Sequence, residues 1–194
     1  MMNYFEAIKN RRSIHALEDV EVIPDEKVLE IVELALDHTP TAFNGQETRA
    51  VVLFGEKHRE LWNDAEKIAR EKVGDGDFSR TESRINGFRN GRGTILFFQD
   101  TAITKDFQKR MPQFHNEFDI WAQQNQGMLQ YVVWAGLEAV GYAASLQHME
   151  MNLNSEWNIP ESWKLIAQMP FGKQAQELND KHIVQTEEKL IVIR

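Results

Sequence analysis

Cysteine is absent from this sequence of 194 residues. Its absence excludes disulfide bonds, thiolate metal sites and cysteine nucleophiles, and it is typical of proteins from a reducing compartment. Long apolar runs are missing too: none approaches the roughly 20 residues of a membrane-spanning helix, and no charged-then-apolar leader opens the chain. We therefore expect a cytoplasmic protein that does not interact with a membrane.

Positive charge is scarce as well. Lys and Arg number 22 against 30 Asp and Glu, which gives a formal net charge of -8 at pH 7. This balance opposes general binding to nucleic acid, so any bound anion must be small and held in a local basic pocket. The length and the 42% hydrophobic content suit one substantial core, and we expect a single domain over 1–194.

The common catalytic motifs are missing. The sequence contains no GxGxxG, GxxxxGK[ST], HExxH or GxSxG, so the signatures of dinucleotide-binding folds, P-loops, zincins and hydrolases are lacking. Its six histidines do not pair with carboxylates at metal-ligand spacing, and we expect no metal site. The residues alone therefore name no catalytic side chain.

Hydrophobic periodicity divides the chain into helices and strands. Helices are predicted over 24–37, 56–72, 105–123 and 126–147, and strands over 50–55, 94–100, 163–172 and 189–194. The helix over 126–147 is apolar on more than one stripe, which indicates a central position. The glycine- and charge-rich stretch 73–93 predicts a long surface connection with at most one helical turn. Strands separated by helices favour an α/β or α+β sandwich, with a last strand available to pair beyond its own domain.

RRSIH is the first candidate binding stretch. It places Arg11, Arg12 and Ser13 directly after a short amphipathic run. Guanidinium forks and a hydroxyl beside a helix end suit a phosphate. The same residues also suit an ordinary solvated helix end, and their spacing alone leaves both interpretations open.

TPTAFNGQ, over 39–46, is the second candidate. It is a proline-stiffened link between a helix and a strand, in which Asn44 and Gln46 offer amide donors and acceptors at alternating positions. Such amides can read the edge of a heteroaromatic ring. They can equally cap the preceding helix and turn the chain.

Four motifs follow one another along the chain: RRSI, then TPTAFNGQ, then NQGMLQYVVWAGLEAVGYAASLQH, then MPFGK before a last strand. Together they resemble the FMN-dependent nitroreductase family over nearly the whole chain. The resemblance is strongest to the short subfamily of bacterial and fungal nitroreductases, in which LQH and WNIPESWKLIAQMPFGK recur. Each motif alone is weak, but four in this order with these gaps are specific.

The resemblance implies an α+β fold, a sandwich with a central, mostly antiparallel sheet flanked by helices, in a domain-swapped homodimer with FMN at the subunit interface. In the family, NADH or NADPH passes a hydride to the flavin and leaves, and a nitroaromatic or quinone then takes two electrons at the same site. Because the flavin carries the chemistry, no catalytic side chain is required, which accounts for the missing motifs.

The resemblance also assigns FMN contacts to residues of this sequence. Those matching phosphate and ribityl contacts are Arg11, Arg12, Ser13, His15 and one of Lys173 and Lys181. Those matching the loop that reaches the flavin, usually from the partner subunit, are Thr39, Pro40, Thr41, Asn44 and Gln46. Those matching contacts to the ring are Leu146, Gln147 and Arg84.

Three departures from the family pattern affect these assignments. Many members carry arginine where this sequence has His15, so one phosphate contact is expected to be weaker or to depend on pH. The C-terminal basic pair of longer relatives reads Lys181-His182 here, and Lys173 could take its place. The gap before Arg84 also differs. Candidates for an apolar ceiling over the ring, otherwise ordinary core or dimer contacts, are Phe78, Phe88, Phe107, Phe114 and Trp121.

Two other functions are compatible with the sequence. A flavin-binding sensor would keep the same cofactor contacts with little turnover of reduced nicotinamide. A plain interaction module would be colourless and would not take up FMN. The sequence names neither the physiological acceptor nor the preferred nicotinamide, since no clamp for a 2′-phosphate is recognisable.

Overall fold

The computed structural model describes residues 2–153 and 155–194. Its helices are α1 (Tyr4–Asn10), α2 (Asp25–His38), α3 (Gly55–Val73), α4 (Ser79–Arg89), α5 (Thr101–Arg110) and α6 (His115–Ala139). Its strands are β1 (Leu17–Glu18), β2 (Thr48–Phe54), β3 (Gly93–Asp100), β4 (Ala143–Ala144) and β5 (Trp163–Gln174). Short 3-10 turns are η1 (Ala42–Asn44), η2 (Pro112–Phe114), η3 (Ser155–Trp157) and η4 (Thr186–Glu188).

One sheet organises the chain. Its strand order is β1-β5-β3-β2, with β4 also paired to β5, and every one of these pairings is antiparallel. Strand β3 lies at the centre, and its run from Ile95 to Phe98 is completely buried. Because helices cover both faces of the sheet, this strand is continuously apolar rather than alternating.

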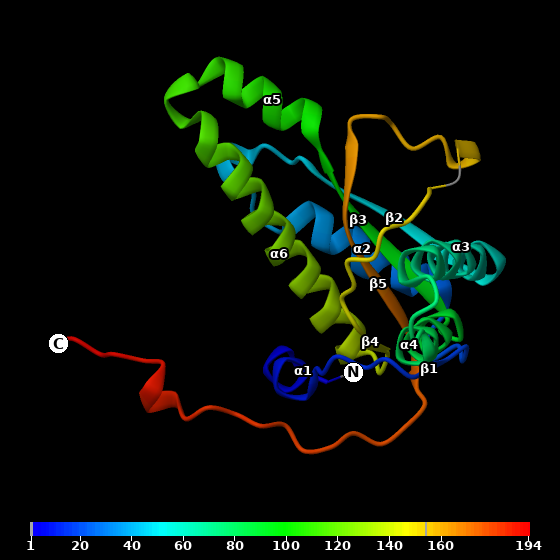
Figure 1. Cartoon of the computed structure of the whole chain (residues 1–194). Coiled ribbons are helices and arrows are strands. Elements are labelled where there is room, and N and C mark those ends of the chain that lie inside the picture. The colour runs from blue at the N-terminus through cyan, green and yellow to red at the C-terminus, as the bar shows by residue number, and fades with distance from the viewer. Residues whose placement is uncertain (1, 154) are drawn as a thin grey trace.

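Alternate residues of β3 enter two separate cores. Ile95 and Phe97 pack with α2 and α6, whereas Leu96 and Phe98 pack with α3 and α4. Figure 1 shows the sheet between these two sets of helices, with α6 crossing one face as the longest element. This arrangement confirms the predicted α+β sandwich with an antiparallel sheet.

The strongly periodic segments were predicted correctly. Helix α2 fills 24–37 and helix α3 fills 56–72 to within a residue or two, and strands β2, β3 and β5 lie where apolar runs predicted them. None of the helices in the described part of the chain combines the length and apolarity that a membrane crossing needs.

The stretch 73–93 was predicted wrongly as an irregular connection. Most of it forms α4, an 11-residue helix. Ile85 and Phe88 are buried against Trp62 and Leu61, so tertiary packing stabilises a helix whose own sequence has little periodicity. Gly87, which suggested a break in the helix, instead lets α4 pack closely against the backbone of His15.

The boundaries of the last predicted helices were also wrong. Helix α6 begins at His115 and ends at Ala139, so 140–147 is not helical. Gly141 adopts a φ of 94° and turns the chain, after which Ala143 and Ala144 pair with β5. The buried Tyr142 hydroxyl donates to the Ile23 carbonyl and accepts from the Val22 amide, which fixes the turn against the start of α2.

The C-terminal tail follows β5 and lies along the outside of the molecule. Figure 1 shows it passing below α1 and away from the sheet. The predicted strand over 189–194 is not formed within this chain, and Ile191 and Ile193 are 89% and 93% exposed. Contiguous exposed apolar side chains of this kind are typical of interaction surfaces.

Candidate functional site

The RRSIH segment is anchored beside the turn that follows α6. Ser13 forms a parallel bridge with Ala144, and the Ile14 amide donates to the Ala144 carbonyl at 3.0 Å. The Ile14 side chain is buried, whereas Ser13 is exposed. These contacts bring Arg12, Ser13 and His15 close to the segment that contains Leu146.

Arg11 and Arg12 are held by different parts of the molecule. The Arg11 guanidinium carbon lies 4.3 Å from the centroid of the Trp134 ring on α6, and its Nε is buried without a hydrogen-bond partner in the described residues. Arg12 instead reaches the tail, where its Nη1 donates to the Asn179 carbonyl at 3.1 Å. Unsatisfied buried donors are uncommon in folded proteins, and the Arg11 Nε atom is one of several in the described residues.

Helix α4 adds Arg84 to this region. Gly87, one turn further along, lies so close to the RRSIH backbone that a Cβ there would be 2.2 Å from the His15 carbonyl oxygen. Burial, with a smaller contribution from the positive charge of Arg84, lowers the pKa of His15 below 6.5. Arg84 and His15 are therefore close enough to interact through their charges.

Leu146 and Gln147 lie beside the middle of β5. The Gln147 amide donates to the Gln168 carbonyl at 2.7 Å, and the Gln168 amide donates to the Gln147 carbonyl at 2.9 Å. The Gln147 side chain donates to Ser145 at 3.1 Å. This segment is therefore fixed as a short extension of the sheet.

The two candidate lysines differ in how firmly they are held. Lys173 is on β5 opposite Glu18, close to RRSIH because the Ala175 amide donates to the Ala16 carbonyl at 3.0 Å. Lys181 is exposed in the tail, two residues beyond the Asn179 carbonyl that accepts from Arg12.

These cations form no close ion pair among the described residues, although the charge of Arg11 partly offsets the rise that burial causes in the pKa of Glu138. Among the ion pairs of the described residues, none involves Arg11, Arg12, Arg84, Lys173 or Lys181. Ten other Arg and Lys residues do form ion pairs, as expected for an acidic chain. We name the region formed by Arg11, Arg12, Ser13, His15, Arg84 and Lys173 the basic end. Its cations outside close ion pairs suit an anion.

The segment 39–46 forms a tight, strained loop. Phe43, Asn44 and Gln46 all have φ values between 51° and 53°, in the left-handed region that non-glycine residues seldom adopt. The Gln46 amide donates to the Thr41 hydroxyl at 2.9 Å, which closes the loop on itself. Thr39 and Pro40 lead into it from the end of α2. We name 39–46 the amide loop.

Aromatic side chains hold the amide loop against α5 and α6. The Phe43 ring centroid lies 5.8 to 6.4 Å from the rings of Phe107, Phe114, Phe118 and Trp121. Two other ceiling candidates, Phe78 and Phe88, belong to the core beneath α3 and α4 and are buried. Phe118 belongs to the aromatic residues of 105–123 that were expected to cover a pocket or a partner subunit, whereas Phe43 was not singled out.

The basic end and the amide loop lie at opposite ends of α6. Arg11 contacts Trp134, whereas Phe43 contacts Trp121, and these two tryptophans are 13 positions apart. At 1.5 Å per residue the separation along the helix is about 20 Å. Figure 1 shows α1 beside one end of α6 and α5 beside the other. One chain therefore does not bring the two groups of predicted residues together.

Three residues near the amide loop were not identified from the sequence. Glu47 and Asn125 form a buried hydrogen bond, and Arg49 donates to the Gln46 carbonyl and pairs with Asp100. In the sequence, Glu47 and Arg49 resemble ordinary surface residues beside a loop. The one signal for them is their position just after TPTAFNGQ.

Comparison with known proteins gives this geometry a context. The sequence pattern of the Nitroreductase family matches residues 8–173, which is most of the chain. The chain belongs to this family. Nitroreductase FRM2 of Saccharomyces cerevisiae is 32% identical over 175 residues, covering 88% of this chain and 87% of FRM2. As a member of this family, the protein is an oxidoreductase.

Solved structures agree with this assignment. The nitroreductase CinD of Lactococcus lactis, in complex with chloramphenicol, has a TM-score of 0.85 and 32% identity, covering 99% of this chain and all of CinD. A protein of Exiguobacterium sibiricum in complex with FMN has the same fold, with a TM-score of 0.72 at 14% identity over 100% of this chain and 98% of that one. The relatives support a short nitroreductase with the fold described above.

Proposed function

We propose that the protein is an FMN-dependent oxidoreductase that takes a hydride from NADH or NADPH and delivers two electrons to nitroaromatic or quinone-type acceptors. The observation that carries this proposal is the basic end, where Arg12, Arg84 and Lys173, which form no ion pair among the described residues, lie within or beside the RRSIH segment. When bound, FMN supplies the electron transfer itself, so the protein has to bind, orient and shield it.

The residues of the basic end fit the phosphate of FMN. Arg12 and Lys173 offer charged donors at an accessible surface, and the buried Arg11 Nε has no acceptor in the described residues. A phosphate dianion would supply acceptors for these donors and would raise the pKa of His15. Arg84, on helix α4, suits a polar edge of the flavin ring system, further from the phosphate.

The segment after α6 and the amide loop suit the flavin ring. Leu146 and Gln147 are fixed by β5 and present one apolar and one amide side chain. The amide loop offers Asn44 and Gln46 from a backbone that is already folded, so little ordering would accompany binding. Since the loop lies about 20 Å from Arg11 along α6, we infer that it serves the basic end of a second copy.

A homodimer would bring the two ends together. A groove between α2 and α6 is almost entirely apolar, and Leu34 at its edge is 59% exposed. Gly136 permits the close approach of α2 and α6, since a Cβ there would be 2.7 Å from Ile31. The edge strand β2 is paired only with β3 within the described residues, and 189–194 is an apolar segment in need of a partner strand. We propose that two copies exchange their C-terminal segments, so that 189–194 of each copy pairs with the edge strand β2 of the other.

The purified protein is expected to be yellow and to contain about one FMN per chain. Gentle purification followed by an absorbance spectrum, and titration of any apoprotein with FMN, measures this. Steady-state oxidation of NADH or NADPH with a quinone present then separates an enzyme from a flavin sensor. A protein that shows no saturable uptake of FMN would contradict the proposed function.

The protein is expected to be a dimer that needs its C-terminal run. Replacing Ile191 and Ile193 together with aspartate would place two charges where an apolar strand should pair, and should raise the dimer dissociation constant at least about 10-fold, or 1.4 kcal/mol. Sedimentation at micromolar concentration measures this, with Glu188→Lys as a control in the same tail. A double variant that stays dimeric and retains FMN would exclude exchange of the tail.

A further inference from the structure

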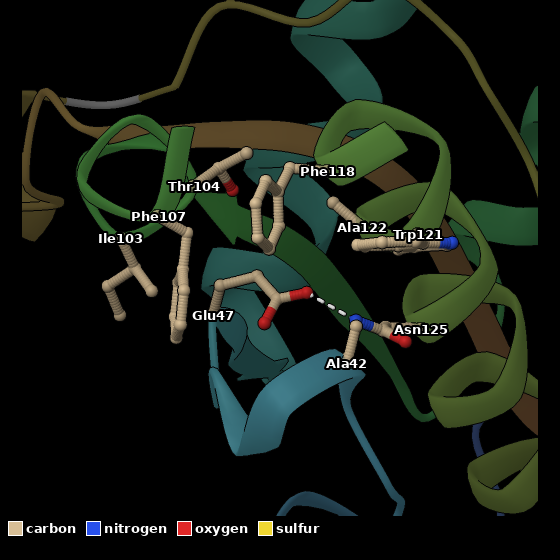
Figure 2. Close-up of a pocket in the computed structure, with 9 residues that line it drawn as sticks. All are labelled: Ala42, Glu47, Ile103, Thr104, Phe107, Phe118, Trp121, Ala122 and Asn125. Carbon is tan, nitrogen blue, oxygen red and sulfur yellow. Dashed lines mark hydrogen bonds between the residues drawn. The ribbon is translucent and has the colours of Figure 1, made fainter. Parts of the chain in front are cut away.

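Glu47 stands out among the acidic residues because it is buried directly beneath the amide loop. Its side chain is 5% exposed, and it lies in a small pocket lined by the aromatic rings of α5 and α6. Figure 2 shows its carboxylate pointing toward Asn125 on α6. A carboxylate is seldom buried unless hydrogen bonds compensate for the lost hydration.

We propose that Glu47 and Asn125 form a positioning pair that holds the amide loop in its strained conformation and thereby aims Asn44 and Gln46 at the flavin ring. The inference rests on the proposed function, because it assigns the loop to the flavin. Its structural part, that the pair holds the loop, can be tested without any cofactor.

The pair joins the loop to α6, the longest helix of the described chain. Asn125 Nδ2 donates to Glu47 Oε1 at 2.6 Å, and Asn125 is only 4% exposed. The Glu47 carbonyl accepts from the Asp100 amide at 2.7 Å, which fixes its backbone at the end of β3. Glu47 is therefore held from both sides, and its side chain has little freedom to move.

The loop rests on this carboxylate. A Cβ at Gly45 would lie 3.0 Å from Glu47 Oε2 and 3.1 Å from the Phe107 ring, so the loop backbone is seated directly on both. Three of the four residues over 43–46 are left-handed, and such strain persists only where the surroundings enforce it. Thr41 and Arg49 hold the Gln46 amide and carbonyl, and the aromatic cluster holds Phe43. Glu47 supports the backbone between them, at Gly45.

Loss of the Glu47 carboxylate would lower the fraction of molecules in which the amide loop has its binding conformation. Without the carboxylate, the left-handed residues can relax toward ordinary conformations, and only a fraction of molecules would present Asn44 and Gln46 correctly. The apparent affinity for the ring falls by that fraction. Because the loop addresses the ring and not the phosphate, FMN and riboflavin should be affected equally.

The experiment compares Glu47→Ala, Glu47→Gln and Asn125→Ala with a matched control, Thr104→Val. Thr104 lines the same pocket, and its hydroxyl accepts a buried hydrogen bond from Gln99 at 2.8 Å, but that bond ties β3 to α5 and does not reach the loop. The measurements are amide hydrogen exchange over 43–46 without FMN, dissociation constants for FMN and riboflavin, and the absorbance spectrum of bound flavin.

We expect Glu47→Ala and Asn125→Ala to speed exchange over 43–46 and to weaken binding of both flavins about 10-fold, with a shifted flavin spectrum. Glu47→Gln keeps an acceptor for Asn125 and should restore most of the protection and affinity. Unchanged exchange in Glu47→Ala, no rescue by glutamine, or the same losses in Thr104→Val would each overturn the positioning role. If the wild type takes up no FMN but Glu47→Ala and Asn125→Ala still speed exchange over 43–46, the proposed function is overturned. The conclusion that the pair holds the loop would then stand.

Discussion

Replacing Arg12 with alanine is expected to weaken FMN binding roughly 10- to 150-fold. The substitution removes a charge-assisted contact to the phosphate on the order of 1.5 to 3 kcal/mol. Arg12 is the cleaner of the two arginines to test, because Arg11 also stacks on Trp134 and its loss would disturb the packing of α1 on α6. The measurement is the dissociation constant for FMN, obtained by titrating apoprotein and following flavin fluorescence.

Riboflavin is the control ligand, because it lacks the phosphate. Its affinity should hardly change in Arg12→Ala, and Lys67→Ala, which removes the same charge from the outer face of α3, should affect neither ligand. Equal losses for FMN and riboflavin would place Arg12 away from the phosphate. An effect within about 0.5 kcal/mol would mean that RRSIH is only a solvated helix end.

Acidification is expected to destabilise the fold through His58. This side chain is completely buried between α3 and β3, and burial lowers the pKa of its imidazole from 6.5 to about 4. Its Nε2 donates to the Arg89 carbonyl at 3.1 Å, while Nδ1 lies 2.8 Å from the Thr94 hydroxyl, which already accepts from Trp62 Nε1. Nδ1 is therefore best assigned as the acceptor for the Thr94 proton, in a neutral imidazole.

The direction in which stability changes with pH follows from the proton that His58 takes up on unfolding. Below pH 6.5 the unfolded chain protonates His58 while the folded chain does not, so stability falls as the pH drops from about 6.5 toward 4. The full loss is about 3 kcal/mol. Urea unfolding at a series of pH values measures it, comparing wild type with His58→Gln and with His38→Gln, whose side chain is exposed. A wild-type slope that persists in His58→Gln would assign the effect to other groups.

Glycine explains why parts of the fold escaped prediction. Where apolar residues recur at helical spacing, as in α2, the pattern alone determines the element. Gly87 and Gly141 were ambiguous: one permits a helix to touch the His15 backbone, and the other ends a helix whose alanines then join a sheet. Such close approaches depend on partners distant in the sequence, so no local pattern reveals them.

The site was predictable in outline but not in geometry. The motifs placed RRSIH, the amide loop and Leu146 in one candidate site, and the structure brings RRSIH and Leu146 together. The direction of Arg11 depends on Trp134, far along the chain, and the burial of Glu47 depends on Asn125. A side chain's partner across the fold decides its role, and a single sequence does not contain that information.

The separation of the basic end and the amide loop along α6 has a genetic consequence. In the proposed dimer each site takes its basic end from one chain and its loop from the other. If one chain lacks Arg12 and its partner lacks Glu47, one site carries both defects and the other is whole. If a single chain carries both substitutions beside a wild-type partner, each site carries one defect. Two damaged alleles would therefore complement each other in trans, whereas the same lesions in cis would leave no intact site in the mixed dimer.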